Sequence, residues 1–154
     1  MKLSKKQVGL IAIGCVLAFI LINSMMNGAI SQWISELPKK IYQLFIPYGK
    51  IKWLDNFLIN EIRKFAHFAE YFVLGILIIK FYYYKNKSIQ RLVNCIFILF
   101  SVSFLDETIQ IFSHRQSKIT DIWLDLFGAL SGMFLYILYR YLKTKFLDSK
   151  IRRE

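Results

Sequence analysis

The fold of this chain is decided by the stretch "LDETIQIFSHRQSKITDIWLD", which runs from Leu105 to Asp125. It contains four carboxylates, a histidine and an arginine. The segments on either side, "CIFILFSVSF" (95–104) and "LFGALSGMFLYILY" (126–139), carry no charge. About 20 apolar residues span the roughly 30 Å core of a bilayer. The stretch therefore predicts the junction of two transmembrane helices, with ionisable groups gathered near one membrane surface.

The whole chain has the composition of a membrane protein. Of its 154 residues 56% are hydrophobic, and the mean hydropathy is +0.41, which is high for a soluble domain. We predict an all-α fold, an integral membrane four-helix bundle that forms a single domain over residues 1–154. Apolar length places the transmembrane helices at about 8–26, 65–84, 89–112 and 119–141.

The segment 27–63, between the first two spans, has a different pattern. Apolar side chains recur at three- and four-residue spacings, as at Trp33, Ile34 and Leu37, and Pro38 and Pro47 divide the segment into short pieces. This pattern is typical of amphipathic helices that lie in the membrane surface. We expect interfacial helices here, on the outer side; a loosely ordered loop is the alternative.

The net charge of +11 is explained by topology. In a soluble protein it would suggest nucleic acid, but here Lys and Arg gather at the ends of the apolar segments. They precede the first span, join the second to the third, and follow the fourth. The positive-inside rule then places both termini in the cytoplasm and residues 27–63 and 113–118 outside. We predict a multi-pass protein of the cell membrane, with lipid and not nucleic acid as partner.

Helix geometry puts ionisable residues of three spans at a similar depth. Asp106 is fifteen residues from Arg91, and Asp125 is fifteen residues from Arg140. At about 1.5 Å per residue, each acid lies about 22 Å from that basic boundary. His67 lies about 20 Å from Lys80 by the same measure. We therefore expect these groups in the outer half of the bilayer, facing the interior of the bundle.

The polar residues of each span also share one face, because they recur at helical spacing. They are Arg63, His67, Glu70 and Tyr71 on the second span, Asp106, Glu107 and Gln110 on the third, and Asp121 and Asp125 on the fourth. On the fourth span the stripe continues into Gly128 and Gly132, a G-x-x-x-G spacing that lets another backbone approach closely.

Burying so many ionisable groups is costly. One unpaired charge at mid-bilayer costs about 2.5–3.5 kcal/mol on insertion scales. Arg63, Lys64, Arg115 and Lys118 lie at the same end and can supply partners. Intramembrane ionisable groups are functional candidates; the alternative is an ion-pair network that only holds three helices together.

Two blocks of the sequence resemble the signature regions of VanZ-like membrane proteins. They are "RKFAHFAEYFVLG" (Arg63–Gly75) and "DETIQIFSHRQSKITDIWLDLFGALSG" (Asp106–Gly132). The chain departs from the family pattern at Asp125, where the family usually has Asn, and at Ser113 and His114, which replace a Pro-Gly turn. The resemblance implies a cytoplasmic-membrane protein linked to resistance to teicoplanin-type glycopeptide antibiotics.

From these residues we expect a site that acts on a lipid-linked or other cell-envelope substrate. The candidates for general acid/base catalysis are His67, Glu70, Asp106, Glu107, Asp121 and Asp125. The same groups could hold a divalent cation, whose presence and identity the sequence leaves undetermined. The candidates for substrate binding are Arg63, Lys64, Tyr71, Gln110 and Arg115. The basic side chains among them would contact a phosphate or carboxylate of the substrate.

Two other classes of function stay open at this point. The first is a non-catalytic membrane protein that binds a lipid headgroup, an antibiotic or a partner protein. The second is a transporter, which the apolar segments "CIFILFSVSF" and "FLYILY" disfavour because they seal the inner half of the bundle. The chain contains neither G-x-S-x-G nor H-E-x-x-H. The enzyme class, and the oligomeric state, are therefore not assigned.

Overall fold

A computed structural model describes residues 3–26, 52–83, 88–113 and 118–151, with side chains described in 3–26, 64–83, 88–113 and 118–146. All regular structure within these ranges is helical. The elements are α1 (Lys5–Met25), α3 (Lys52–Ile78), the π-helical segment η1 (Ile79–Tyr83), α4 (Ile89–Phe112) and α5 (Ile119–Ile151). The all-α prediction is confirmed for this part of the chain.

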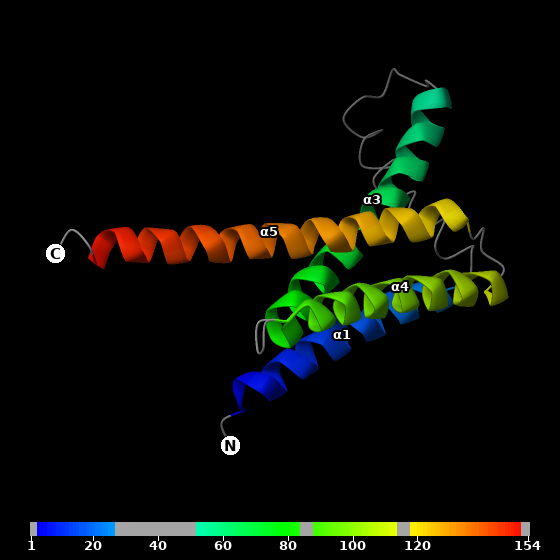
Figure 1. The fold of residues 1–154 in the computed structure, drawn as a ribbon. Helices are drawn as coiled ribbons and strands as arrows, with labels where there is room; N and C mark the ends of the chain where they lie inside the picture. Colours follow the sequence, from blue (N-terminus) through cyan, green and yellow to red (C-terminus); the bar gives the residue numbers. More distant parts are fainter. Residues whose placement is uncertain (1–2, 27–51, 84–87, 114–117, 152–154) are drawn as a thin grey trace.

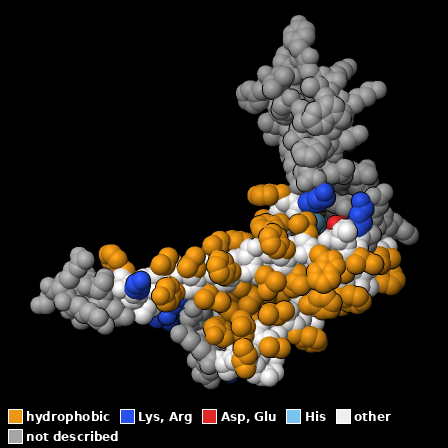
Figure 2. Space-filling model, turned by 45° about the horizontal axis from the view of Figure 1, so that its top comes forward, with side chains coloured by type: hydrophobic (Ala, Val, Ile, Leu, Met, Phe, Trp, Pro, Cys, Tyr) orange, Lys and Arg blue, Asp and Glu red, His pale blue; other side chains and the backbone are white. Residues whose placement is uncertain are grey.

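Within the described residues, four helical segments are long and apolar enough to cross a membrane: Lys5–Met25, Lys64–Tyr83, Ile89–Phe112 and Ile119–Phe146. Large apolar side chains cover their outer faces; Phe97, Trp123 and Phe134 are 68%, 66% and 65% exposed. Figure 2 shows this apolar surface extending across most of one face of the molecule. A continuous apolar surface of this kind is unfavourable in water and suited to lipid. The protein is therefore a multi-pass membrane protein.

The helix ends differ from the predicted spans at three places. α1 begins at Lys5, because Ser4 and Gln7 form a capping box in which each side chain accepts the other's backbone N–H. α5 continues beyond Tyr141 to Ile151, since no Gly or Pro interrupts that segment. Residues 52–63, predicted to be part of the interfacial region, form the first part of α3. Residues 27–51 lie outside the described ranges.

α3 and α5 cross in close contact near the middle of the bundle (Figure 1). Gly128 and Gly132 of α5 lie directly against the backbone carbonyl groups of Phe68 and Phe72 on α3, and Gly75 of α3 makes the reciprocal contact with α5. A Cβ at any of the three positions would overlap a carbonyl oxygen. The close backbone approach predicted from the G-x-x-x-G spacing is confirmed.

α1 and α4 run side by side and pack against α3 (Figure 1). The apolar core is small and draws on all four spans, with Ile20, Leu74, Leu99 and Met133 among its buried members. The first residues of α1 and the last residues of α5 lie toward the same end of the bundle (Figure 1). This arrangement is the one expected for the four spans that the described residues contain.

Candidate functional site in the bundle interior

A group of buried polar side chains lies beside the apolar core, on the side away from the start of α1 and the end of α5. We call this group the buried polar layer; its members in the described residues are Ser24, His67, Ser103, Asp106, Glu107, Gln110, Asp121 and Asp125. They come from α1, α3, α4 and α5. Asp106, Gln110 and Asp125 are fully inaccessible, at 0% exposure. Ionisable groups from three helices, together with a serine from the fourth, therefore meet inside the protein and not against lipid.

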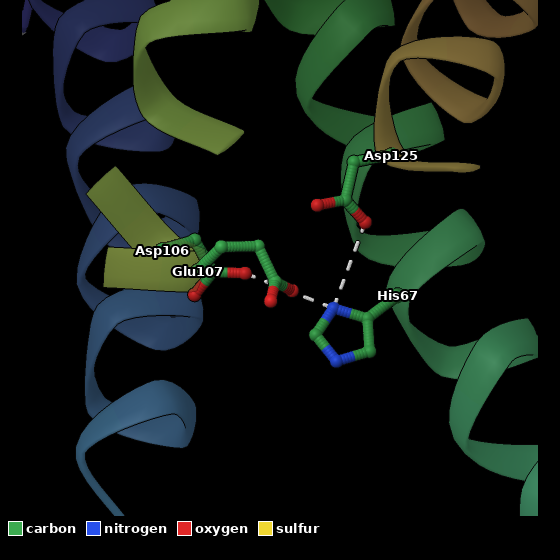
Figure 3. A group of neighbouring side chains, drawn as sticks. All are labelled: His67, Asp106, Glu107 and Asp125. Atoms are coloured by element: carbon green, nitrogen blue, oxygen red, sulfur yellow. Dashed lines mark ion pairs between the residues drawn. The ribbon is translucent and has the colours of Figure 1, made fainter. Parts of the chain in front are cut away.

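The imidazole of His67 lies between two carboxylates. Its Nδ1 atom is 3.6 Å from Asp125 Oδ1 and 3.7 Å from Asp106 Oδ2. Figure 3 shows the ring directed between the acids of α4 and the single acid of α5, with Glu107 beside Asp106. The His67 ring therefore lies between the carboxylate of α5 and the carboxylates of α4 and contacts both sides.

Serine hydroxyls hold the other oxygen of both aspartates. Ser24 Oγ of α1 donates to Asp106 Oδ1, and Ser103 Oγ of α4 donates to Asp125 Oδ2 at 2.8 Å. All four side chains are buried. Each aspartate therefore has one oxygen fixed by a neutral donor and the second oxygen directed toward His67.

Glu107 is fixed from two sides. Gln110 Nε2 donates to Glu107 Oε1 at 3.2 Å and lies 3.4 Å from Asp106 Oδ2. The backbone N–H of Lys118, at the start of α5, donates to Glu107 Oε2 at 3.2 Å. Glu107 thereby ties the end of α4 to the beginning of α5, next to the two aspartates.

The remaining predicted residues have different surroundings. Glu70 is half-buried and its Oε1 accepts a hydrogen bond from Asn23 Nδ2 at 2.9 Å. Asp121 is buried near the start of α5, and Tyr71 is a fully buried member of the apolar core. The Lys64 side chain is exposed. The side chains of Arg63 and Arg115 lie outside the described part, so their predicted role in binding substrate stays a prediction.

Sequence reasoning missed the contribution of α1. Asn23 and Ser24 contact Glu70 and Asp106, although α1 was assigned to no site. A signal was present, because these two adjacent polar residues end an otherwise apolar run. Ser103 was also missed; it lies one helical turn before Asp106, so it faces the same side of α4.

The layer contains a set of atoms that could hold a metal ion. His67, Asp106, Glu107 and Asp125 each offer one ligand atom, and these atoms lie within 4.8 Å of one another. All four residues are buried. Acid/base chemistry and cation binding both fit a histidine surrounded by carboxylates.

These features define a polytopic α-helical membrane protein with an ionisable site inside its helix bundle. The chain belongs to the VanZ/LLP1 family, whose model matches residues 9–140. The match covers the whole buried polar layer and confirms the resemblance carried by the two sequence blocks. Comparison with curated proteins and with solved structures gave no match.

Proposed function

We propose that this VanZ-family protein acts in the cell membrane on a lipid-linked or other cell-envelope substrate, and that the buried polar layer carries out the chemistry. The link to glycopeptide (teicoplanin) resistance is part of the proposal and comes from the family. The proposed location has both termini in the cytoplasm and the layer in the outer leaflet. The proposed substrate then meets the site from the outer surface of the membrane.

The observation that carries the proposal is the burial of three carboxylates around one imidazole. Asp106 and Asp125 are 0% exposed and Glu107 is 3% exposed. Each charge placed in the membrane interior costs about 2.5–3.5 kcal/mol on insertion scales. Packing alone could be achieved more cheaply with apolar side chains. A chemical role for the cluster gives a reason for this cost.

Charge distribution supports the proposed orientation. Lys5, Lys80, Arg91 and Arg140 line one pocket and therefore share one end of the bundle. The buried polar layer lies about 22 Å further along α4 from Arg91, at 1.5 Å per residue. Basic residues favour the cytoplasmic side, and this supports the proposed position of the layer toward the outside. Among the residues coloured by type in Figure 2, an acidic side chain is visible beside basic ones.

The geometry suits proton transfer. In the proposed mechanism, one aspartate orients the His67 imidazole, and the imidazole or the second aspartate accepts a proton from an attacking hydroxyl or water. Glu107, Asp121 and Glu70 are the other proposed acid/base groups. Arg63, Lys64 and Arg115 are the proposed ligands of a substrate phosphate or carboxylate, with Tyr71 and Gln110 beside them.

The test combines a cellular and a biochemical measurement. His67→Gln and Asp106→Asn are compared with wild type for teicoplanin resistance and for conversion of labelled lipid-linked envelope precursors by purified protein. Both variants should lose about a hundredfold in conversion rate while still inserting in the membrane. Thr108→Val is the matched control on α4, because the Thr108 hydroxyl bonds to the Phe104 carbonyl of its own helix and lies outside the layer.

Two outcomes count against this proposal. Unchanged resistance and conversion in both variants would leave the layer with a purely structural role. Binding of a precursor or of teicoplanin without conversion, and lost in His67→Gln, would instead establish the alternative, a non-catalytic binding protein.

A further inference from the structure

We propose that His67, Asp106, Glu107 and Asp125 form a binding site for one divalent transition-metal ion, Mn²⁺ or Zn²⁺. The inference rests on the proposed function for the ion's role in chemistry, whereas binding of the ion can be measured without any substrate. It assigns a ligand to the buried polar layer. It also accounts for the distances between His67 Nδ1 and the two aspartate oxygens, which ordinary hydrogen bonds do not explain.

The spacing around His67 is the first argument. Its Nδ1 atom lies 3.6 and 3.7 Å from the oxygens of Asp125 and Asp106. A direct N–H···O hydrogen bond is about 2.7–3.2 Å long. Two ligand atoms bound at about 2.1 Å to one tetrahedral ion lie about 3.4 Å apart. The observed separations are too long for hydrogen bonds and close to those of atoms that share a metal ion.

The fourth ligand completes a compact set. One ligand atom of each residue lies within 4.8 Å of all the others. Opposite ligands of an octahedral ion with bonds of about 2.1 Å are about 4.2 Å apart. Small side-chain adjustments therefore bring all four atoms to bonding distance, with positions left for water or for a substrate oxygen. One imidazole with three carboxylates favours Mn²⁺ or Zn²⁺ over Ca²⁺, which prefers oxygen ligands alone.

An unsatisfied buried oxygen is the independent observation. Asp125 Oδ1 accepts no hydrogen bond, although Asp125 is 0% exposed. An unsatisfied buried polar atom is costly, more so when it is charged. Figure 3 shows Asp125 directed at His67 and the carboxylates of α4. A cation bound among these groups satisfies this oxygen, which no described hydrogen-bond donor reaches.

The surrounding hydrogen bonds have the pattern of support for metal ligands. Ser24, Ser103 and the backbone N–H of Lys118 each donate to one oxygen of a different carboxylate. The second oxygens of Asp106 and Asp125 are thereby directed at His67, whereas Glu107 Oε1 is held beside them by Gln110 Nε2. Such supporting groups are typical of metal sites, and removing one lowers metal affinity by about 10–100-fold.

The experiment measures metal binding to the purified full-length protein in detergent. The protein is treated with EDTA, freed of the chelator, and titrated with Mn²⁺ by electron paramagnetic resonance and with Zn²⁺ by competition against a fluorescent chelator. We expect one ion per chain. His67→Gln and Asp125→Asn should each weaken binding about tenfold or more. Thr108→Val is the matched control, because Thr108 follows Glu107 on α4 but bonds to the Phe104 carbonyl outside the ion set, and should bind as wild type does.

Unfolding measurements keep the test independent of folding defects. The ion should raise the melting temperature of wild type and of Thr108→Val, because it binds only the folded state. It should leave the melting temperature of the two ligand variants unchanged. Absence of stoichiometric Mn²⁺ and Zn²⁺ binding to folded wild type overturns the inference, as does equal binding by all four proteins. Substrate conversion that persists in chelator-treated protein contradicts the metal site and leaves the proposed function intact. Ion binding without substrate conversion supports the metal site and contradicts the proposed function.

A second site is carried by a different observation, a pocket of about 770 Å³ at the basic end of the bundle. Lys5 and Lys6 of α1, Lys80 of η1, Arg91 of α4 and Arg140 of α5 all line it. Among the described residues that line it, none is acidic. Cations from four elements thus converge on one hollow.

The walls of this pocket include apolar groups. Leu10 and Ile13 of α1 and the ring of Phe81 line it. The Phe81 ring lies so close to Gly9 that a Cβ there would overlap it. We infer that this pocket binds the headgroup of an anionic phospholipid, with the phosphate among the cations and the start of an acyl chain along the apolar wall. Basic pockets between transmembrane helices recognise such headgroups.

Native mass spectrometry tests this assignment. Delipidated protein is mixed with phosphatidylglycerol, with phosphatidylcholine or with free glycerol 3-phosphate at equal concentration. Wild type should retain phosphatidylglycerol preferentially, and the double variant Lys80→Gln/Arg91→Gln should lose most of this preference. Lys143→Gln is the matched control, since Lys143 is exposed outside the pocket. Equal retention of both lipids, an unchanged double variant, or binding of glycerol 3-phosphate as tight as that of the lipid overturns the assignment.

Discussion

His67 of α3 and Asp125 of α5 face each other in the bundle interior, with Nδ1 3.6 Å from Oδ1. A close contact between the backbones of α3 and α5 lies directly beside His67 and Asp125 and sets this distance. Gly128, one helical turn after Asp125, lies against the backbone carbonyl of Phe68, the residue that follows His67. The geometry of the buried polar layer thus depends on a glycine contact between two helices.

Replacing Gly128 with alanine should separate α3 and α5 and disturb the His67–Asp125 pair. The new Cβ would overlap the Phe68 carbonyl oxygen, and overpacking of this kind costs about 1–3 kcal/mol. Gly128→Ala is expected to lower the melting temperature in detergent and to weaken Mn²⁺ or Zn²⁺ binding. Gly14→Ala is the control, because its Cβ would meet nothing within 4 Å; the higher helix propensity of alanine should leave that variant as stable or more stable. Equal loss of stability in both variants would refute the assignment of the Gly128 contact.

Ser103→Ala should destabilise the protein more than Ser101→Ala. Ser103 donates to the buried Asp125 carboxylate at 2.8 Å, and leaving a buried acceptor without its donor costs about 1–3 kcal/mol. Ser101 only bonds to the Phe97 carbonyl of its own helix, so its replacement should cost less than about 0.5 kcal/mol. Thermal unfolding of the two variants, followed by near-ultraviolet circular dichroism, measures the difference. A larger loss at Ser101 would contradict the proposed support of Asp125.

The α1–α3 contact can be measured by a double-mutant cycle. Asn23 Nδ2 donates to Glu70 Oε1 at 2.9 Å, and hydrogen bonds to charged groups contribute about 1.5–3 kcal/mol. The single variants Asn23→Ala and Glu70→Ala and the double variant should therefore show a coupling energy of about 1 kcal/mol or more. Additive effects would mean that the Asn23–Glu70 contact does not couple α1 to α3 energetically.

The proposed topology predicts opposite labelling of the two ends of α4. Ser88 caps its start and Ser113 its end. In a Cys15→Ala background, because Cys15 is an exposed free thiol, Ser113→Cys should react with a membrane-impermeant maleimide in intact cells. Ser88→Cys should react only after lysis. The reverse pattern would place the buried polar layer on the cytoplasmic side and would contradict the proposed access of an outer-leaflet substrate.

Apolar length predicted the spans well, and α4 has the predicted limits of 89–112 because both ends carry polar caps. The helical period also identified which faces carry His67, Asp106 and Asp125. The role of α1 was not predictable in the same way, since two polar residues at a helix end usually mark the membrane interface. The continuity of 52–63 with α3 was missed because the amphipathic pattern was assigned to a separate interfacial helix. The absence of Gly and Pro from residues 52–64 was the signal that one helix continues there.

Distances were beyond the reach of sequence. Spacing shows that Asp106 and Asp125 lie at similar depth, but it does not show how closely they approach His67. That separation follows from the glycine contacts between α3 and α5 and from the serines that orient each carboxylate. The residue pattern of a single sequence shows neither which backbone groups the glycines contact nor which carboxylate each serine orients.

The serine contacts also have a consequence for the order in which the protein is made. A ribosome delivers α1 and α3 to the membrane before α4, so Ser24 and His67 are already present when Asp106 arrives. Ser103, on α4, in turn precedes its partner Asp125, which enters with the last helix. Asp106 and Asp125 thus each meet an earlier-made partner, and insertion from the amino terminus does not require either aspartate to wait in lipid for a helix still to be translated.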